Sequence, residues 1–383
     1  MGLRSYGAES IGENFLKYSQ VVVDSGQYGR YYDRDGVPRS GMVDSLEERF
    51  RQWTGRPYAV CQVSATQALV SALTAVGVAG GEVLVPAYSF VACPSAVQFA
   101  GATPVLVGSD ENLTMSVTDA RRLVSRNTRA IMIVHMRGRP ADTAALVRLG
   151  RELGIPVIED LSQFDGMALT GDCPDTGVSD LAVFSFQARK MLSAGEGGMV
   201  LANDDRHFKA VTQLTDSAWF LRPQYEDWPE PTGPGVVGSR MNEITAAMVL
   251  SQWDDVQRLV LRGREVAGRL RARLTAAQLD LPGVPNGTEG LTVGIRTPSV
   301  EAARGLAHVL RAEEIGVYPE SSGTAETHSY PGWPSYIKDA CVIDETAAGT
   351  LAGLRRTVLF QVQPEWSDDR LDSITALITG QLS

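Results

Sequence analysis

A single lysine, Lys190, stands in a sequence setting that could make it chemically reactive. Residues 181–186 form an apolar, β-prone run that predicts a buried strand. Residues 195–198 read Gly-Glu-Gly-Gly, which lets the backbone approach a ligand closely. A lysine at the rim of a buried sheet loses hydration, and its amine then becomes a usable nucleophile. The chain has only four lysines (Lys17, Lys190, Lys209, Lys338) among its 35 basic residues. An isolated lysine in a hairpin is usually a surface residue, so the neighbouring motifs must decide whether Lys190 is reactive.

The second candidate group is the carboxylate of Asp160, because residues 157–160 read VIED and end an apolar strand in two acids. A carboxylate at a buried strand end needs a cationic partner. A protonated pyridine nitrogen would serve, and the ring that carries it would become an electron sink for carbanion chemistry. Taken alone, Asp160 could equally cap a helix or lie at the surface.

Two further motifs follow expected strands. Ser64 and Thr66 lie where a helix begins, and the free backbone N–H groups and dipole of a helix start can bind an anion. Ordinary helix capping would explain the same residues. Tyr88 and Phe90 follow another strand and could stack on a flat ring, although aromatic residues more often pack in a core.

Strands and helices alternate along the first 204 residues, which predicts an α/β fold with a mainly parallel sheet covered by helices on both faces. In such sheets ligands bind at the carboxyl ends of the strands, where Ser64, Asp160 and Lys190 fall. We expect strands at 58–63, 83–85, 104–107, 130–136, 156–160, 181–186 and 199–202, and helices at 66–78, 94–100, 118–125 and 142–154.

Three units are expected along the chain. Residues 1–50 form an irregular arm that runs into a helix at 42–53, residues 51–255 form the large domain, and residues 256–383 form a smaller α/β domain. A long helix at 242–276 joins the two domains. The small domain should contain strands at 291–295 and 358–362 and helices at 300–313, 345–357 and 368–382.

Composition narrows the classes of function. The 383 residues carry a formal net charge of −10, which argues against nucleic acid as a partner. No apolar run is long enough to span a membrane, and the first residues lack the apolar core of a signal peptide, so we expect a cytoplasmic protein. The four cysteines are widely spaced and contain no CxxC pair, so we expect neither a metal site nor a disulfide framework.

The candidate features follow one another in the order typical of a pyridoxal phosphate site. They are an anion-binding helix start, an aromatic residue that could stack on a ring, a carboxylate and a lysine. With these motifs the chain resembles the DegT/DnrJ/EryC1/StrS family of sugar and cyclitol aminotransferases, which have the large aspartate-aminotransferase fold (fold type I). The motifs that carry the resemblance are SATQAL at 64–69, PAYSFVAC at 86–93, AGATPVLV at 100–107, RAIMIVHMRGRPAD at 129–142, VIEDLSQ at 157–163 and FSFQARKMLSAGEGGMVLAND at 184–204.

The resemblance implies a role for each matching residue. Lys190 would bind pyridoxal 5'-phosphate covalently, Asp160 would pair with its pyridine nitrogen, and Gln163 would lie at its phenolic oxygen. Phe90 would stack on the ring. The phosphate would be held by Ala65, Thr66 and Ser185, with Ser64 beside them. The expected substrate contacts are His135, Arg137, Tyr318, His328 and Tyr330, the last three within a segment at 318–336 that would close over the acceptor. The family's sites lie at a two-fold interface, so a homodimer is expected.

Some positions depart from the family pattern. Gly238 stands where the family usually has an Asn that reaches the phosphate of the neighbouring subunit, and Arg137 stands where many members have Tyr. Gln187, Met191 and Ser193 look closer to cyclitol aminotransferases and to 3-amino-5-hydroxybenzoate synthase.

We therefore expect an aminotransferase of secondary metabolism that moves an amino group from glutamine or glutamate to a keto-cyclitol or keto-sugar, with a small carbocyclic ketone favoured. A lyase or dehydratase on the same cofactor and a non-catalytic regulator with this fold stay open as alternatives.

Overall fold

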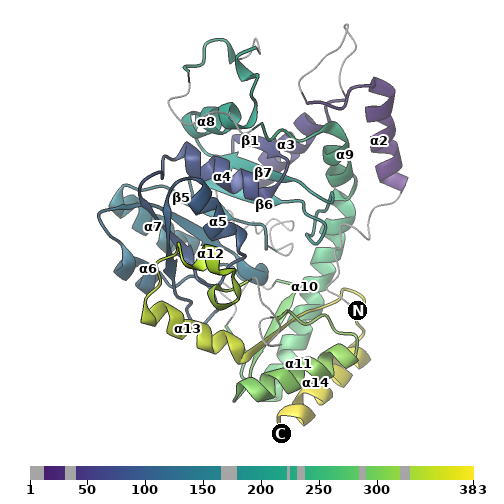
Figure 1. The fold of residues 1–383 in the computed structure, drawn as a ribbon. Coiled ribbons are helices and arrows are strands. Elements are labelled where there is room, and N and C mark those ends of the chain that lie inside the picture. The colour runs from purple at the N-terminus through teal and green to yellow at the C-terminus, as the bar shows by residue number, and fades with distance from the viewer. Residues whose placement is uncertain are drawn as a thin grey trace.

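The computed structural model describes residues 13–30, 40–164, 179–221, 225–230, 238–283, 290–319 and 328–383. Its centre is a seven-stranded sheet with strand order β1-β7-β6-β5-β4-β2-β3 (Figure 1). β7 is antiparallel to both of its neighbours, and the remaining strand pairs are parallel. The predicted α/β fold with a mainly parallel sheet is thus confirmed. The strands are β1 (Tyr58–Gln62), β2 (Glu82–Pro86), β3 (Thr103–Val107), β4 (Thr128–Val134), β5 (Val157–Asp160), β6 (Leu181–Ser185) and β7 (Gly198–Ala202).

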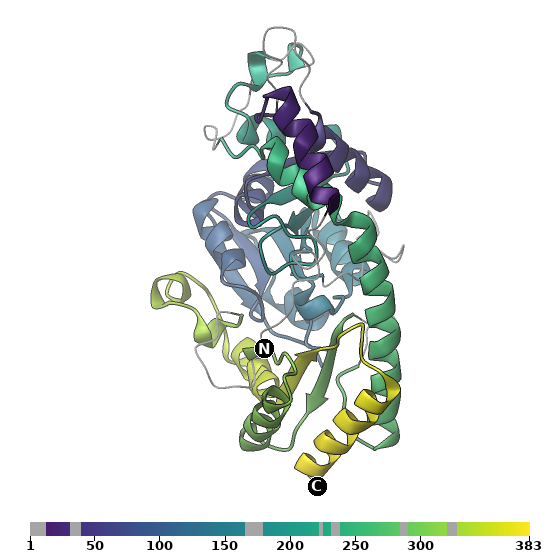
Figure 2. The same cartoon turned by 90° about the vertical axis from the view of Figure 1, so that its right-hand side faces the viewer.

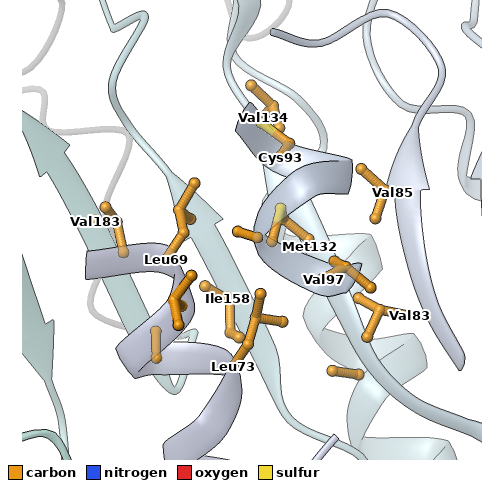
Figure 3. Packing of buried hydrophobic residues seen from close by; sticks show 14 of the residues in the cluster. Leu69, Leu73, Val83, Val85, Cys93, Val97, Met132, Val134, Ile158 and Val183 are labelled. Carbon is orange, nitrogen blue, oxygen red and sulfur yellow. The ribbon is translucent and has the colours of Figure 1, made fainter. Parts of the chain in front are cut away.

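Helices cover both faces of this sheet, because successive strand residues point to opposite sides and most of them are apolar. On one face, α4 (Ala65–Ala75) and α5 (Ala92–Phe99) pack Leu69, Leu73 and Val97 against strand residues that include Ile158 and Val183 (Figure 3). On the other face lie α3 (Met42–Thr54), α6 (Val117–Leu123), α7 (Thr143–Leu153) and α9 (Glu243–Ser251).

The long joining helix expected at 242–276 is divided at Gln252 into α9 and α10 (Trp253–Ala276). Gln252 is fully buried, and its side chain accepts a hydrogen bond from the backbone N–H of Ser193 (2.9 Å) and donates one to the Ser193 carbonyl (2.6 Å). The junction between α9 and α10 is therefore hydrogen-bonded to the turn that contains Lys190. Beyond it, α10 runs alongside the sheet to the far end of the molecule (Figure 2).

The C-terminal part has its own core around the antiparallel pair β8 (Thr292–Arg296) and β9 (Thr357–Gln361). α10, α11 (Val300–Ala312) and α14 (Asp368–Leu382) supply the apolar side chains that cover it. Residues 330–354, between α11 and β9, instead pack on the large sheet. There Trp333, Ile337 and Leu351 join the core of α4 and α5, and Val342 bridges to Val105 of β3. The returning helices are α12 (Ser335–Lys338) and α13 (Glu345–Arg355).

The domain limits expected from the sequence do not coincide with this arrangement at two points. The limit at residue 255 falls inside α10, and the returning segment packs on the large sheet although it lies within the expected small domain. Three of the described α-helices were not expected, namely the short α12 in the returning segment and two earlier ones. α2 (Glu13–Ser25) replaces part of the supposed irregular arm, and α8 (Asp205–Thr215) follows β7.

The remaining expectations on composition can be compared with the described residues. Among them, no helix is both long and apolar enough to cross a membrane, and no group of three or more His, Cys, Asp or Glu side chains is placed to hold a metal ion. Cys61, Cys93 and Cys341 are free thiols there, while Cys173 lies outside the described residues.

Candidate active site

The strand register brings two distant segments together at the carboxyl edge of the sheet. Ser185 at the end of β6 lies opposite Gly198, and Gly198 lies opposite Gln62 at the end of β1. A Cβ atom on Gly198 would collide with the backbone of Ser64 and Ala65, so only glycine lets β7 pass this turn. The close approach brings the start of α4 next to Gly198, which pairs with Ser185 of β6.

The start of α4 is built as an anion-binding helix terminus. The Ser64 hydroxyl oxygen accepts a hydrogen bond from the N–H of Gln67 (3.2 Å), which caps the helix. The N–H groups of Ala65 and Thr66 come before the first intrahelical hydrogen bond and carry the positive end of the helix dipole. A phosphate group fits this arrangement, because it supplies the oxygen acceptors that these donors require.

Asp160 ends β5 between β4 and β6, and its side chain is only 3% exposed. One carboxylate oxygen accepts from the backbone N–H of Ser162 (2.9 Å) and the other from the thiol of Cys93 on α5 (3.2 Å). Burial raises the pKa of the Cys93 thiol, and the neighbouring Asp160 carboxylate raises it further, so the thiol keeps its proton and acts as the donor. A buried carboxylate that accepts from one backbone N–H and one weak thiol donor is suited to a cationic ring nitrogen.

Lys190 lies in a turn between β6 and β7, and backbone hydrogen bonds within the turn hold its shape. The Lys190 N–H donates to the Gln187 carbonyl (2.8 Å), and the Ala194 N–H donates to the Phe186 carbonyl (2.8 Å). Met191 is buried in the core beneath the turn. The positive charge of Lys190 contributes to lowering the pKa of the His328 ring and partly offsets the raised pKa of the Cys93 thiol.

Phe90 follows β2 and is 39% exposed, although it lies beside the sheet edge just described. Its ring centroid is 5.2 Å from that of His328, with the two planes tilted by 40°. An aromatic face left partly uncovered at this edge is suited to stacking on a flat ring.

His135, which the sequence predicts near the substrate side, lies in the interior of the fold. Its ring is fully buried, with Nε2 3.2 Å from Glu159 Oε1 and Nδ1 accepting from the N–H of Ala141 (3.2 Å). Glu159 also accepts from Thr143 (2.9 Å) and lies 3.6 Å from the buried guanidinium of Arg56. Burial by itself would raise the pKa of Glu159, but the hydrogen bond from His135, the one from Ser179 and the charge of Arg56 together lower it. His135 is thus part of a buried network on the face of the sheet opposite Asp160.

The other expected substrate residues lie beyond the ends of β4 and β2. Arg137 is 5% exposed, donates to Gln163 Oε1 (3.5 Å) and lies over the ring of Tyr318, with Cζ 3.9 Å from the centroid. Tyr330 is anchored by its N–H to the Ala87 carbonyl (3.0 Å). Residues 320–327 of the expected closing segment lie outside the described residues.

Cys93 and Gln252 were missed as supporting residues of the site. Cys93 stands in the PAYSFVAC motif three residues after Phe90, so helical spacing could have placed it towards the same edge. No local signal marks Gln252, because its partner Ser193 is distant in the sequence.

With this geometry established, comparison with known proteins identifies the family. The family described as the DegT/DnrJ/EryC1/StrS aminotransferase family matches residues 13–330. The chain belongs to this family. Its membership confirms the resemblance drawn from the motifs, the assignment as a pyridoxal phosphate-dependent aminotransferase and pyridoxal phosphate as the cofactor.

Two curated relatives of this aminotransferase carry the name GDP-perosamine synthase. The protein of Escherichia coli O157:H7 is 33% identical over 231 residues, which cover 60% of this chain and 62% of that protein, less than two thirds of its length. The protein of Vibrio cholerae is 30% identical over 281 residues, 73% of each chain.

Solved structures share the fold. A DegT/DnrJ/EryC1/StrS aminotransferase from Brucella abortus matches with a TM-score of 0.79 and 21% identity over the full length of both chains. The structure of 3-amino-5-hydroxybenzoic acid synthase matches with a TM-score of 0.77 and 21% identity, covering 97% of this chain and 96% of the other. At this level of identity the likeness establishes the fold type and no more.

The Glu159 network gives a prediction on stability. Glu159→Gln leaves the Arg56 charge buried without its counter-charge, so it should lower the free energy of unfolding at pH 7 by about 3–5 kcal/mol. The pKa of Glu159 is lowered in the folded state, so its contribution is fully present above the ordinary value of 4.5 and is lost as the pH falls through the folded pKa.

The difference in unfolding free energy between wild type and Glu159→Gln should therefore shrink in acid, as measured by urea unfolding between pH 7 and pH 3. Glu152→Gln removes an exposed partner of Arg121 and serves as the control, with little change expected. A constant difference across this pH range would contradict the assignment.

Proposed function

We propose that the enzyme transfers the amino group of an amino acid to the ketone of a sugar ring, in the biosynthesis of an amino sugar. Overall, the amino acid becomes a 2-oxo acid and the ketone becomes an amine, so no external oxidant or reductant is required. Pyridoxal phosphate supplies the carbonyl that carries the amine and the ring that accepts the electron pair. The observation that carries the proposal is the convergence of Lys190, Asp160 and the start of α4 on one edge of the sheet.

The residues at this edge have separate tasks. The Lys190 amine holds the cofactor until the donor arrives and then moves the proton from the donor's α-carbon. Asp160 keeps the pyridine nitrogen protonated, and Phe90 and Gln163 orient the ring. The phosphate is held by the α4 terminus with Ser64, Ala65, Thr66 and Ser185.

Two of the residues that favoured a carbocyclic acceptor lie in the interior. Met191 packs in the core, and Ser193 is buried, with its backbone bonded to Gln252. Gln187 accepts from the N–H of Arg189, which shapes the lysine turn (2.9 Å). Differences at these positions adjust how the turn packs, so the carbocyclic preference loses most of its basis. The names of the two curated relatives support a keto-sugar, as a nucleotide-linked substrate.

Lys190 is tested by chemical trapping. Borohydride should fix the cofactor irreversibly on the residue that holds it, and peptide mapping by mass spectrometry should find the label on residue 190. Lys190→Ala should bind the cofactor without this link and lose transfer activity. A label on Lys17, Lys209 or Lys338 would rule out the assignment, and a protein that never binds the cofactor would support a regulator.

Asp160 is tested by a nearly isosteric replacement. Asp160→Asn should fold normally but slow removal of the donor's α-proton by orders of magnitude, on the order of several kcal/mol of transition-state stabilisation, because Asn cannot keep the ring nitrogen protonated. Stopped-flow absorbance of the donor half-reaction measures the rate. Asp254→Asn, at an exposed position of α10, is the matched control. Near-normal rates in Asp160→Asn would refute the role.

The acceptor is tested one compound at a time. The enzyme, loaded with the aminated cofactor by excess glutamate and then freed of donor, should regain its original absorbance band with a nucleotide-linked keto-sugar. Keto-cyclitols at the same concentration should react at least tenfold more slowly. The reverse order would restore the carbocyclic preference, and release of water without amino transfer would favour the dehydratase alternative.

We also propose that two chains associate through α2. Val22 is buried in the fold, but Leu16 and Val23 remain 67% and 51% exposed, seven residues apart on one side of the helix. A second copy of the chain would cover this apolar side. Light scattering should give a dimer for the wild type and a monomer for Leu16→Asp combined with Val23→Asp. An active wild-type monomer would contradict the proposal.

A further inference from the structure

Cys93, the second residue of α5, donates a hydrogen bond that the roles above do not use. Its thiol lies 3.2 Å from Asp160 Oδ2, and its backbone N–H donates to the Phe90 carbonyl (3.0 Å). The Cys93 side chain is fully buried, and Asp160 is 3% exposed. The bond therefore joins two buried groups that come from different elements, α5 and β5.

The strand register places this contact directly at the end of the sheet. Asp160 is paired with Val134 of β4 on one side and with Val183 of β6 on the other. Both valines belong to the apolar core that α4 and α5 cover, and Figure 3 shows Cys93 at the start of α5 beside Val134. The position of the thiol relative to the carboxylate thus follows from strand pairing and helix packing, and it needs no ligand.

Two hydrogen bonds from different segments fix the plane of the Asp160 carboxylate. Oδ1 accepts from the backbone N–H of Ser162 (2.9 Å), and Oδ2 accepts from the Cys93 thiol. Because each oxygen is held by its own donor, rotation of the carboxylate would break at least one of the two bonds. A carboxylate oxygen has about two acceptor positions, so each oxygen keeps the capacity for one further donor.

The chemistry of the thiol matters here, because an S–H group is a weaker donor than an O–H group. A hydroxyl that donates to a carboxylate makes a short, charge-assisted bond that stabilises the negative charge. Burial raises the pKa of the Cys93 thiol well above its ordinary value, and the Asp160 charge raises it further. The thiol therefore stays protonated as a donor at neutral pH, yet it neutralises little of the carboxylate's charge.

We propose that Cys93 is a positioning residue that acts through Asp160. Its thiol holds the carboxylate in one orientation and, as a weak donor, leaves the negative charge available to a cationic partner. This rests on the proposed function, in which that partner is the protonated pyridine nitrogen. Cys93→Ser would keep the orientation but compete for the charge, whereas Cys93→Ala would release the orientation and leave the charge.

The hydrogen bond itself is tested by infrared spectroscopy of the enzyme with and without bound cofactor. The S–H stretching band of Cys93 is isolated as the difference between spectra recorded with and without Cys93→Ser. Asp160→Asn replaces a charged acceptor by a neutral one, so the band should move to higher wavenumber in that variant. A band that does not move would show that the thiol does not donate to Asp160, and it would overturn the inference.

Two variants then separate orientation from charge. In Cys93→Ser, the NMR signal of a cofactor isotope-labelled at its pyridine nitrogen should move towards the unprotonated position. Removal of the donor's α-proton should slow on the order of 2- to 10-fold in this variant, the size of one hydrogen bond. In Cys93→Ala, the signal should stay at the protonated position, while the dissociation constant of the cofactor rises by a similar factor.

Cys341 offers a matched control, because its thiol donates to the Ile337 carbonyl at the same distance of 3.2 Å. Cys341→Ser and Cys341→Ala should leave cofactor binding, the NMR signal and the rate of proton removal unaltered. Urea unfolding midpoints close to that of the wild type show that each variant has folded.

Two further results would overturn the inference. If Cys93 merely fills space, Cys93→Ser and Cys93→Ala should behave alike and leave the NMR signal in place. A wild-type rate in Cys93→Ser would show that the weakness of the thiol donor is not used. If instead Asp160→Asn leaves the NMR signal at the protonated position, the pairing of Asp160 with the ring nitrogen is refuted, and with it this part of the proposed function, whatever the infrared band shows.

Discussion

Two adjacent carboxylates at the end of β5 point to opposite faces of the sheet, and most of the site depends on this alternation. Side chains in a strand alternate strictly, so Glu159 and Asp160 cannot share a face. Glu159 enters a closed network with Arg56, His135 and Thr143. Asp160 points to the face of α4 and α5, where its carboxylate accepts hydrogen bonds from the Cys93 thiol and the Ser162 N–H. The fold thus supplies Glu159 with charged partners, whereas the Asp160 carboxylate remains able to pair with a cationic ring.

The network around Glu159 also links the elements that form the polar edge of the sheet. It joins β4, β5 and the start of α7, and the backbone N–H of His135 donates to the Asp160 carbonyl (3.3 Å). A buried charge with all its partners present resists local rearrangement, because any opening would leave a charge without compensation. The turn that carries Arg137 begins directly after this support.

Close packing fixes the other half of the site. The lysine turn is tied to the joint of α9 and α10 through Gln252, and Gly198 brings β7 against the start of α4. These contacts fix the lysine and the phosphate-binding amides relative to each other before any ligand arrives, which reduces the ordering cost of binding. They also bury Met191 and Ser193 within the packed turn.

The sequence alone determined the α/β class, most strand positions, and the candidacy of Lys190, Asp160 and the start of α4, because strand alternation, apolar runs and glycine-rich turns are local signals. The sequence did not predict α2, because its Val21-Val22-Val23 run has low helix propensity. Packing against α9 stabilises this helix.

Tertiary structure decided the rest. It buried His135 against Glu159, divided the joining helix at Gln252, and packed residues 330–354 on the large sheet. It also set Arg137 against Tyr318, a residue 181 positions later in the chain (318 − 137). These outcomes depend on partners far apart in sequence, and a side chain's partner, unlike its propensity, exists only once the chain has folded.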